Sequence, residues 1–314
     1  MIIDKPVEAI PLSILRPETA PAMLSLALPK RTRVVITGIG AVTPIGNTVE
    51  DFWRNALAGR SGVGKITRID TAPFATHIGA EVKDLDLTQF MDRKEARRMA
   101  RCSQLAIVAA KMAVQDARLN PIDPDRTGVI IGTAVGGVDV IQEGLTDAFT
   151  KGWRTVSPFS VGGAMPNAPA FHISLVFGAR GYNATICTAC ASGTQAIGEA
   201  AEVIRRGAAN VILAGGTECA ITQTAFSGFG QMRVLSTRNE EPERASRPFD
   251  KSRDGIVLGE GSGVLVLESL EHARQRGAPI YAEIVGSAAA GDAFHVTQSD
   301  PQGAGAARAI RWAL

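Results

Sequence analysis

Aromatic residues, cysteines and net charge are all scarce in this chain of 314 residues. Aromatic side chains make up 5% of the sequence, which argues against the stacking platforms that bind nucleobases. The formal net charge of +2 is too close to zero to indicate a nucleic-acid partner. Four cysteines cannot form the dense disulfide framework of a small secreted protein, so a reducing, cytoplasmic compartment is expected. The hydrophobic share of 45% is enough for a large core.

Long apolar runs are also missing. No stretch of about 18 apolar residues occurs, so the sequence predicts no transmembrane helix and no membrane partner. Residues 20–29 are apolar, but Asp4, Glu8 and Glu18 precede them where a signal peptide carries positive charge. We therefore interpret residues 1–30 as a loosely ordered N-terminal extension.

Strand-like apolar runs alternate with helical periodicity along the chain, which is typical of an α/β fold with a buried sheet. The predicted elements are a strand at 33–38, a helix at 49–58, a long helix near 92–118, strands at 127–132 and 183–189, a helix at 191–206, a strand at 210–215, a hairpin of 256–258 with 263–267, a strand at 279–286 and a helix at 303–313. The last two resemble the beginning of a further layer. We expect that the protein continues past Leu314, or that it is a remnant that folds poorly.

Cys190 stands where an extended apolar segment meets a helix rich in small residues. Free backbone N–H groups and the positive end of the helix dipole favour a thiolate there and can receive an oxyanion. Ala191 and Gly193 leave room for a substrate. The sequence therefore predicts that Cys190 is a nucleophile.

Structural rather than catalytic roles are expected for the other cysteines and for two glycine-rich turns. Cys102, Cys187 and Cys219 are expected to be inert core residues. Cys187 and Cys190 also form a C-x-x-C pair, but no second pair and no histidine within ten residues complete a zinc or redox site. Segment 38–40 lacks the third glycine of a dinucleotide-binding loop. Segment 132–137 lacks the lysine of a P-loop, and we expect it to line a cavity.

Basic residues recur at helical spacing in one segment. They are Arg93, Lys94, Arg97, Arg98 and Arg101, and their spacing predicts a stripe on one helix that is either a solvated face or a docking strip for an acidic protein, with Arg233 as an extension. The histidines are His77, His172, His272 and His295. Only His295, in a predicted loop, has a site-like context, and none is assigned as the base beside Cys190.

The sequence from Arg33 to Leu314 resembles the β-ketoacyl-acyl carrier protein synthases of type II fatty acid synthesis, in particular the elongating synthase II class. The resemblance is carried by the segments 34–40, 188–193, 235–239, 246–250, 253–255 and 259–261. It implies a thiolase-like layered α/β/α/β/α fold whose first half is nearly complete and whose second half is truncated. The implied divisions are the extension 1–30, an N-terminal half 31–277 that holds the nucleophile, and the start of a C-terminal half at 278–314.

The resemblance implies an acyltransferase that performs a decarboxylative Claisen condensation in fatty acid elongation. Cys190 would hold the growing acyl chain as a thioester, which the carbanion from malonyl-acyl carrier protein attacks. By position, Val135 and Phe229 would line the acyl pocket, and Thr297 would contact the phosphopantetheine arm. Carrier protein would dock on Lys94, Arg97, Arg98 and Arg233. A homodimer is implied, with the strand before Cys190 near its interface, and no metal or organic cofactor beyond the phosphopantetheine of the carrier protein.

The sequence departs from this family at the decarboxylating residues. The family uses a histidine in a His-Gly-Thr motif, another in a Gly-His motif, and a lysine, and neither motif occurs in these 314 residues. We therefore expect Cys190 to accept an acyl group that malonyl-carrier protein does not discharge. A non-catalytic partner subunit or degenerate fragment, a polyketide ketosynthase subunit and a thiolase stay open, although retention of Cys190 argues against the partner subunit.

Overall fold

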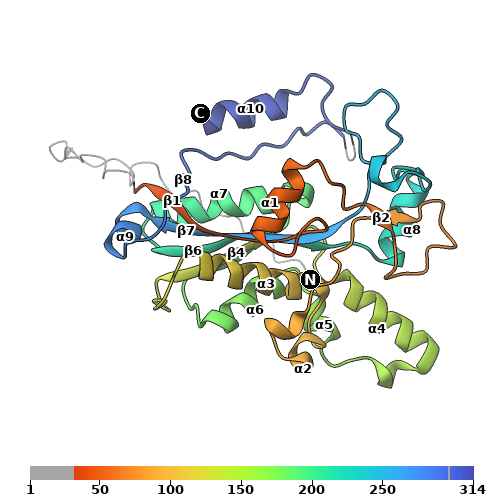
Figure 1. Cartoon of the computed structure of the whole chain (residues 1–314), viewed down its shortest axis with the longest axis horizontal. Helices are drawn as coiled ribbons and strands as arrows, with labels where there is room; N and C mark the ends of the chain where they lie inside the picture. The colour runs from red at the N-terminus through yellow and green to blue at the C-terminus, as the bar shows by residue number, and fades with distance from the viewer. Residues whose placement is uncertain (1–31, 296–297) are drawn as a thin grey trace, which may run out of the picture. The chain divides into compact units, whose positions relative to one another are not determined.

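A six-stranded mixed sheet forms the centre of the computed structural model, which describes residues 32–295 and 298–314. The strand order is β5-β4-β6-β7-β1-β8 (Figure 1). Its strands are β1 (Val34–Val42), β4 (Thr127–Gly132), β5 (Asn183–Ile186), β6 (Val211–Cys219), β7 (Glu260–Ser269) and β8 (Ala282–Glu283). β4 runs parallel to β5 and β6, whereas β7 is antiparallel to β6 and β1. The predicted α/β class is confirmed; the extension 1–30 lies outside the described residues.

Helices cover both faces of this sheet, with α3 on one face and α7 on the other (Figure 1). The helices are α1 (Val49–Leu57), α2 (Arg93–Ala96), α3 (Arg101–Asp116), α4 (Val138–Lys151), α5 (Ser160–Ala164), α6 (Ala168–Phe177), α7 (Ser192–Arg205), α8 (Gln223–Gln231), α9 (Leu270–Gln275) and α10 (Ala304–Ala313). Short 3-10 turns are η2 (Leu87–Gln89), η3 (Trp153–Thr155), η4 (Ala189–Ala191) and η5 (Pro242–Arg244), and β2 (Gly64–Lys65) pairs with β3 (Ile78–Gly79).

The apolar runs of the central strands supply both layers of the core. Along β4, Val129 and Ile131 pack in the layer that contains α3, while Ile130 packs in the layer that contains α7. All three side chains are fully buried. Burial on both faces explains why these strands read as continuous apolar runs rather than alternating ones.

Glycines at 38 and 40 let α3 lie directly against β1. A Cβ at Gly38 would stand 2.2 Å from the carbonyl oxygen of Ala113, and one at Gly40 would stand 1.9 Å from that of Ala109. Any side chain at either position would push the helix away from the sheet. The Gly-x-Gly segment thus serves helix-strand packing.

Three predicted elements differ from the structure. The helix predicted near 92–118 is divided into α2 and α3, because Ala100 is extended and the Arg101 backbone N–H donates to Asp139 Oδ2 at 2.9 Å. The hairpin of 256–258 with 263–267 is wrong, since Ile256 bridges to Leu235 and β7 instead fills the middle of the sheet. Of the strand predicted at 279–286, only β8 pairs, and it joins β1 in the same sheet. The domain boundary at 277 stays a prediction.

Glu268 is a fully buried carboxylate at the end of β7. It accepts hydrogen bonds from Arg276 Nε at 2.9 Å, from His272 Nδ1 at 2.5 Å and from the Thr37 hydroxyl. Burial by itself raises the pKa of Glu268, but the hydrogen bonds from Arg276, Thr37 and His272 outweigh it and leave that pKa below the ordinary value. The cluster joins β1, β7 and α9.

Acid is expected to destabilise the protein partly through Glu268. Because its pKa is lowered in the folded state, its stabilisation is present above the unfolded value of about 4.3 and is lost as the pH falls through the folded value. The Glu268→Gln variant should be less stable at neutral pH and should lose less free energy of unfolding between neutral and acidic pH. Urea unfolding at several pH values tests this, with the exposed Glu243→Gln as control; equal losses in Glu268→Gln and wild type would refute it.

Candidate active site

Cys190 lies exposed in the 3-10 turn η4, between the edge strand β5 and helix α7. The residue before it, Ala189, has a φ of +51°, a left-handed conformation that is uncommon outside glycine. Two hydrogen bonds of Ser192 stabilise the turn: its Oγ accepts from the Thr188 backbone N–H at 2.8 Å and donates to the carbonyl of Ala189 at 2.6 Å. The fold therefore presents the thiol to solvent on a locally tied backbone.

The start of α7 supplies an electropositive environment at this thiol. The helix has 14 residues, and its N-cap residue, Ala191, provides no side-chain hydrogen bond to the first turn. The Ser192 backbone N–H donates to the carbonyl of Ala189, so the later N–H groups of the first turn, together with the helix dipole, face an anion at this end of the helix. This arrangement can stabilise the oxyanion that forms when a thioester is attacked.

The other three cysteines divide into buried and exposed thiols. Burial raises the pKa of Cys102 to about 12 and raises that of Cys219 further above its ordinary range, so both are poor nucleophiles at neutral pH. Cys187, which was expected to be core, is exposed, and its thiol donates to the carbonyl of Ala134 at 3.4 Å. Cys187 and Cys190 are thus the two exposed thiols among the described cysteines.

The loop between β4 and α4 carries Val135 and lies against the segment that leads to Cys190. The Thr133 backbone N–H donates to the carbonyl of Ile186 at 3.1 Å, and the Cys187 thiol reaches the same loop. The Val135 side chain is 47% exposed. Glu218, on β6, holds this loop through hydrogen bonds to Ala134 and Val135, a role that the sequence analysis missed.

The structure does not bring every predicted pocket residue to this loop. Phe229 lies on α8 and packs, partly buried, in a separate apolar cluster around Phe226. Thr297 lies outside the described residues. The placement of both beside an acyl chain stays a prediction.

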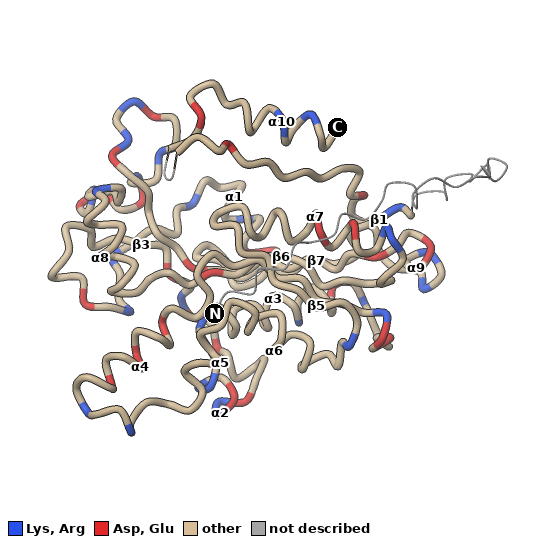
Figure 2. The backbone as a smooth tube through the Cα atoms, turned by 180° about the vertical axis from the view of Figure 1, so that it is seen from behind, with Lys and Arg blue, Asp and Glu red and all other residues tan. Residues whose placement is uncertain are grey.

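The predicted basic stripe is divided between elements. Lys94, Arg97 and Arg98 are exposed on and just after α2, whereas Arg101 begins α3 with a largely buried side chain, so the interpretation of one continuous helical stripe is wrong. Figure 2 shows basic positions along the backbone at α2. Arg97 and Arg98 line a cavity of about 400 Å³. The guanidinium carbon of Arg98 stands 4.8 Å from the ring centroid of Phe159. Arg233 follows α8 and lines a different cavity, of about 650 Å³.

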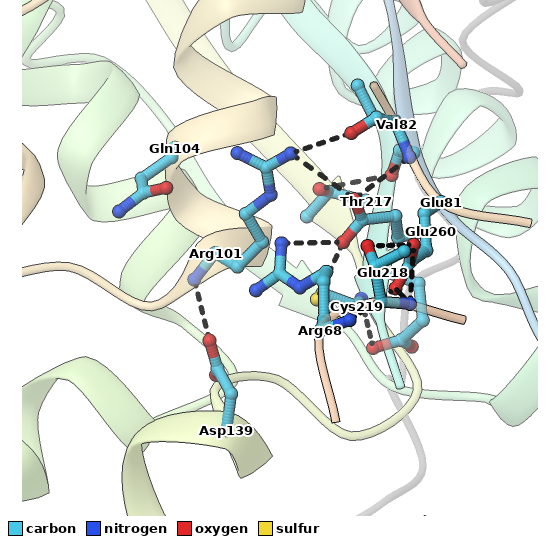
Figure 3. Close-up of polar contacts among 12 residues, drawn as sticks. Arg68, Glu81, Val82, Arg101, Gln104, Asp139, Thr217, Glu218, Cys219 and Glu260 are labelled. Atoms are coloured by element: carbon cyan, nitrogen blue, oxygen red, sulfur yellow. Dashed lines mark hydrogen bonds and ion pairs between the residues drawn. The ribbon is translucent and has the colours of Figure 1, made fainter. Parts of the chain in front are cut away.

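A buried ionic cluster joins Arg68 and Arg101 to Glu260 (Figure 3). The side chain of Glu260 is fully buried at the start of β7. It accepts hydrogen bonds from Arg101 Nη2 at 3.2 Å, Arg68 Nη1 at 3.3 Å, the backbone N–H of Val82 at 2.9 Å and the thiol of Cys219 at 3.1 Å. Sequence reasoning missed this cluster, although an acidic residue at the head of an apolar strand is the signal that could have indicated it.

Two histidines are engaged in hydrogen bonds with other parts of the fold. His77 Nε2 bonds to the carbonyl of Phe74 at 2.9 Å, and His272 belongs to the Glu268 cluster. Burial lowers the pKa of His172, on α6. Within residues 32–295 and 298–314, no hydrogen bond joins a histidine to Cys190.

Comparison with known proteins agrees with this geometry. Residues 31–273 match the model of the β-ketoacyl synthase N-terminal domain. The chain is 48% identical over 287 residues to a 3-oxoacyl-[acyl-carrier-protein] synthase 2 of Synechocystis sp., covering 91% of this chain and 69% of the relative. It is 49% identical over 284 residues to the synthase 2 of Staphylococcus aureus strain COL, covering 90% and 68%.

Solved structures show the same fold. A β-ketoacyl synthase from Burkholderia phymatum superposes with a TM-score of 0.82 at 37% identity, over 90% of this chain and 70% of that one. A type II polyketide ketosynthase in complex with its acyl-carrier protein gives 0.81 at 36% identity, over 91% and 70%. The expected thiolase-like ketosynthase fold is thereby confirmed, and the chain belongs to the β-ketoacyl synthase family.

Proposed function

We propose that this chain is a 3-oxoacyl-[acyl-carrier-protein] synthase of fatty acid elongation in which Cys190 accepts the acyl chain. The observation that carries the proposal is the exposed thiol of Cys190 at the uncapped start of α7. The synthase 2 relatives support the reaction class. Retention of the cysteine favours this reading over a non-catalytic partner subunit.

The first half-reaction follows from the local geometry. The Cys190 thiolate attacks the thioester carbonyl of an acyl-carrier protein, which forms a carbon-sulfur bond and places negative charge on the carbonyl oxygen. Backbone N–H groups at the start of α7 stabilise that charge. Collapse of the tetrahedral intermediate breaks the bond to the pantetheine sulfur, which leaves as a thiolate and takes up a proton. The acyl group is then a thioester of Cys190, with no metal or organic cofactor in the step.

An intact-mass time course tests the acylation. The purified chain is given acyl-carrier protein and then malonyl-carrier protein, and any adduct is mapped to a peptide. The expected result is one acyl group on Cys190. Acylation elsewhere, or none, would refute the nucleophile assignment.

We propose that Lys94, Arg97 and Arg98 bind the acidic surface of the carrier protein, because they are exposed together at α2. Charge reversal in Arg97→Glu should raise the KM for acyl-carrier protein by about 10-fold at low salt and by less at high salt, since rim charges act by screened attraction. Its rate with a small uncharged acyl thioester should not change. The control is Arg308→Glu, on α10; equal KM changes in both variants would contradict the docking assignment.

A homodimer through β5 and α6 is the proposed assembly. β5 is an edge strand of the sheet, and α6 beside it is mostly apolar, with Phe171, Leu175 and Val176 exposed. An exposed apolar helix face is typical of an interface, and an unpaired edge invites a second copy related by twofold symmetry.

Sedimentation velocity tests this assembly. Wild type is expected to sediment as a dimer and Leu175→Glu as a monomer, because the substitution places a charge within the proposed interface. Leu57→Glu, on the exposed face of α1, is the control and should stay dimeric. A monomeric wild-type chain would refute the proposal.

The compartment proposed for the protein is the cytoplasm. All four cysteines are free thiols, and two of them are exposed. Such thiols persist in a reducing compartment. No helix in residues 32–295 and 298–314 is long and apolar enough to cross a membrane.

A further inference from the structure

Glu218 gathers four hydrogen bonds near the end of β6. Its Oε2 accepts from the backbone N–H of Ala134 at 2.7 Å and of Val135 at 3.3 Å, and from Thr133 Oγ1 at 3.4 Å. Its Oε1 accepts from the backbone N–H of Cys219 at 3.2 Å. Burial raises the pKa of this carboxyl, and the hydrogen bonds from the loop only partly oppose the rise.

The three loop bonds converge on a single carboxylate oxygen. The loop also closes on itself, since the Gly136 backbone N–H donates to Thr133 Oγ1 at 3.1 Å and Gly136 has a φ of +66°. No strand pairing fixes residues 134 and 135 in the described part of the chain, so the Glu218 carboxylate is the acceptor that fixes their backbone.

The opposite side of the loop touches the segment that precedes Cys190. The Thr133 backbone N–H bonds to Ile186, and Ala134 accepts from Cys187, three residues before the proposed nucleophile. The loop therefore lies between Glu218 and the segment of the nucleophile. The half-exposed side chain of Val135 projects from it. Loss of the Glu218 carboxylate is expected to release this side chain, while Cys190 stays in the turn η4.

We propose that Glu218 is a positioning residue which sets how well long acyl chains are accepted at Cys190, by fixing the loop that carries Val135. This inference rests on the proposed function, in which Cys190 is acylated. Glu218 is not a catalytic residue, because its carboxylate bonds to backbone and to Thr133 rather than to the nucleophile. The pairing of β6 with β4 and β7 uses main-chain groups, so the sheet does not depend on this side chain.

The test is the rate of Cys190 acylation with a short and a long saturated acyl-carrier protein, measured by intact mass. Glu218→Ala is expected to lower the long-chain rate by about 10-fold and the short-chain rate by less than about 2-fold, since small misplacement of a group remote from the chemistry costs up to about 100-fold. Glu218→Gln keeps one acceptor oxygen and should lie between Glu218→Ala and wild type. Glu271→Ala, on α9, is the control.

The outcomes separate the two proposals. Normal wild-type acylation with an unchanged ratio of long-chain to short-chain rates in both Glu218 variants overturns only this inference. Equal loss at both lengths indicates a merely structural role and also overturns it. Absence of acylation in wild type refutes the nucleophile assignment and this inference with it.

Hydrogen exchange gives a second readout that does not depend on acylation. The amides of Ala134 and Val135 should exchange at least about 10-fold faster in Glu218→Gln or Glu218→Ala than in wild type, because their acceptor is weakened or lost. The amides of β4 should keep their protection. Unchanged protection at residues 134 and 135 would overturn the positioning role even if the Glu218→Ala variant were too unstable for kinetics.

Discussion

Acyl transfer to the Cys190→Ser variant should be slower than to wild type by about 10⁴-fold or more, because a serine hydroxyl is not ionised near neutral pH and α7 offers it no general base. The expected trace is an intact mass that stays at the value of the unmodified chain after incubation with acyl-carrier protein. Serine is close to cysteine in size, and the side chain is exposed, so folding should be unaffected.

Cys187→Ser is the matched control for this result. It removes the other exposed thiol, three residues away, but leaves the start of α7 unchanged. Its acylation rate should stay within about 3-fold of wild type, since only the weak thiol bond to Ala134 is altered. Loss of the adduct in Cys187→Ser with retention in Cys190→Ser would exchange the roles of the two residues.

The free energy of unfolding of the Glu260→Ala variant should be about 3–5 kcal/mol lower than that of wild type. Removing the carboxylate leaves the guanidinium groups beside it without their opposite charge. The guanidinium groups of Arg68 and Arg101 both point at this carboxylate, and the Arg101 side chain is only 13% exposed. Urea denaturation provides the measurement, with the midpoint compared at a constant m-value.

An exposed ion pair supplies the comparison. Glu241→Ala breaks the bridge to Arg244, whose side chain is 72% exposed, and should cost at most about 1 kcal/mol. A cost for Glu260→Ala no greater than that for Glu241→Ala would show that the buried cluster contributes little. The double variant Glu260→Ala with Arg68→Ala would then measure the coupling free energy between these two side chains.

Much of the central sheet was predictable, because strands buried on both faces leave long apolar runs. β4 was predicted at the bounds it has, and α1 and α7 within a residue or two. The hairpin prediction at 256–267 failed because Ile256 bridges to Leu235, and β7 pairs with β1 and β6. Gly261, between the two predicted strands, serves a close approach, since a Cβ there would stand 2.9 Å from the carbonyl oxygen of Val42 on β1. Local pattern carries no information on such long-range contacts.

The site was predicted only where the signal is local. Cys190 could be identified because a cysteine at a strand-helix junction has a chemical consequence of its own. Glu218 and Glu260 could not, because the loop that Glu218 holds and the arginines that pair with Glu260 lie more than 80 residues away along the chain. Arg101 was assigned to an exposed stripe since its spacing fits one, yet the break before α3 turns its guanidinium inward.

The seating of α7 on the sheet has a kinetic implication. A Cβ at Gly132 would stand 2.2 Å from the carbonyl oxygen of Ser192, and one at Gly216 would stand 2.9 Å from Cα of Gly193, so strand ends and helix start meet backbone to backbone. With no side chains between them, this joint has little compressibility and no alternative rotamers. Cys190, in the turn that leads into α7, is therefore carried beside a tightly packed backbone contact, and accommodation of substrates of different bulk falls to the surrounding loops. Variation among homologous enzymes in what they accept should accordingly map to loop sequences.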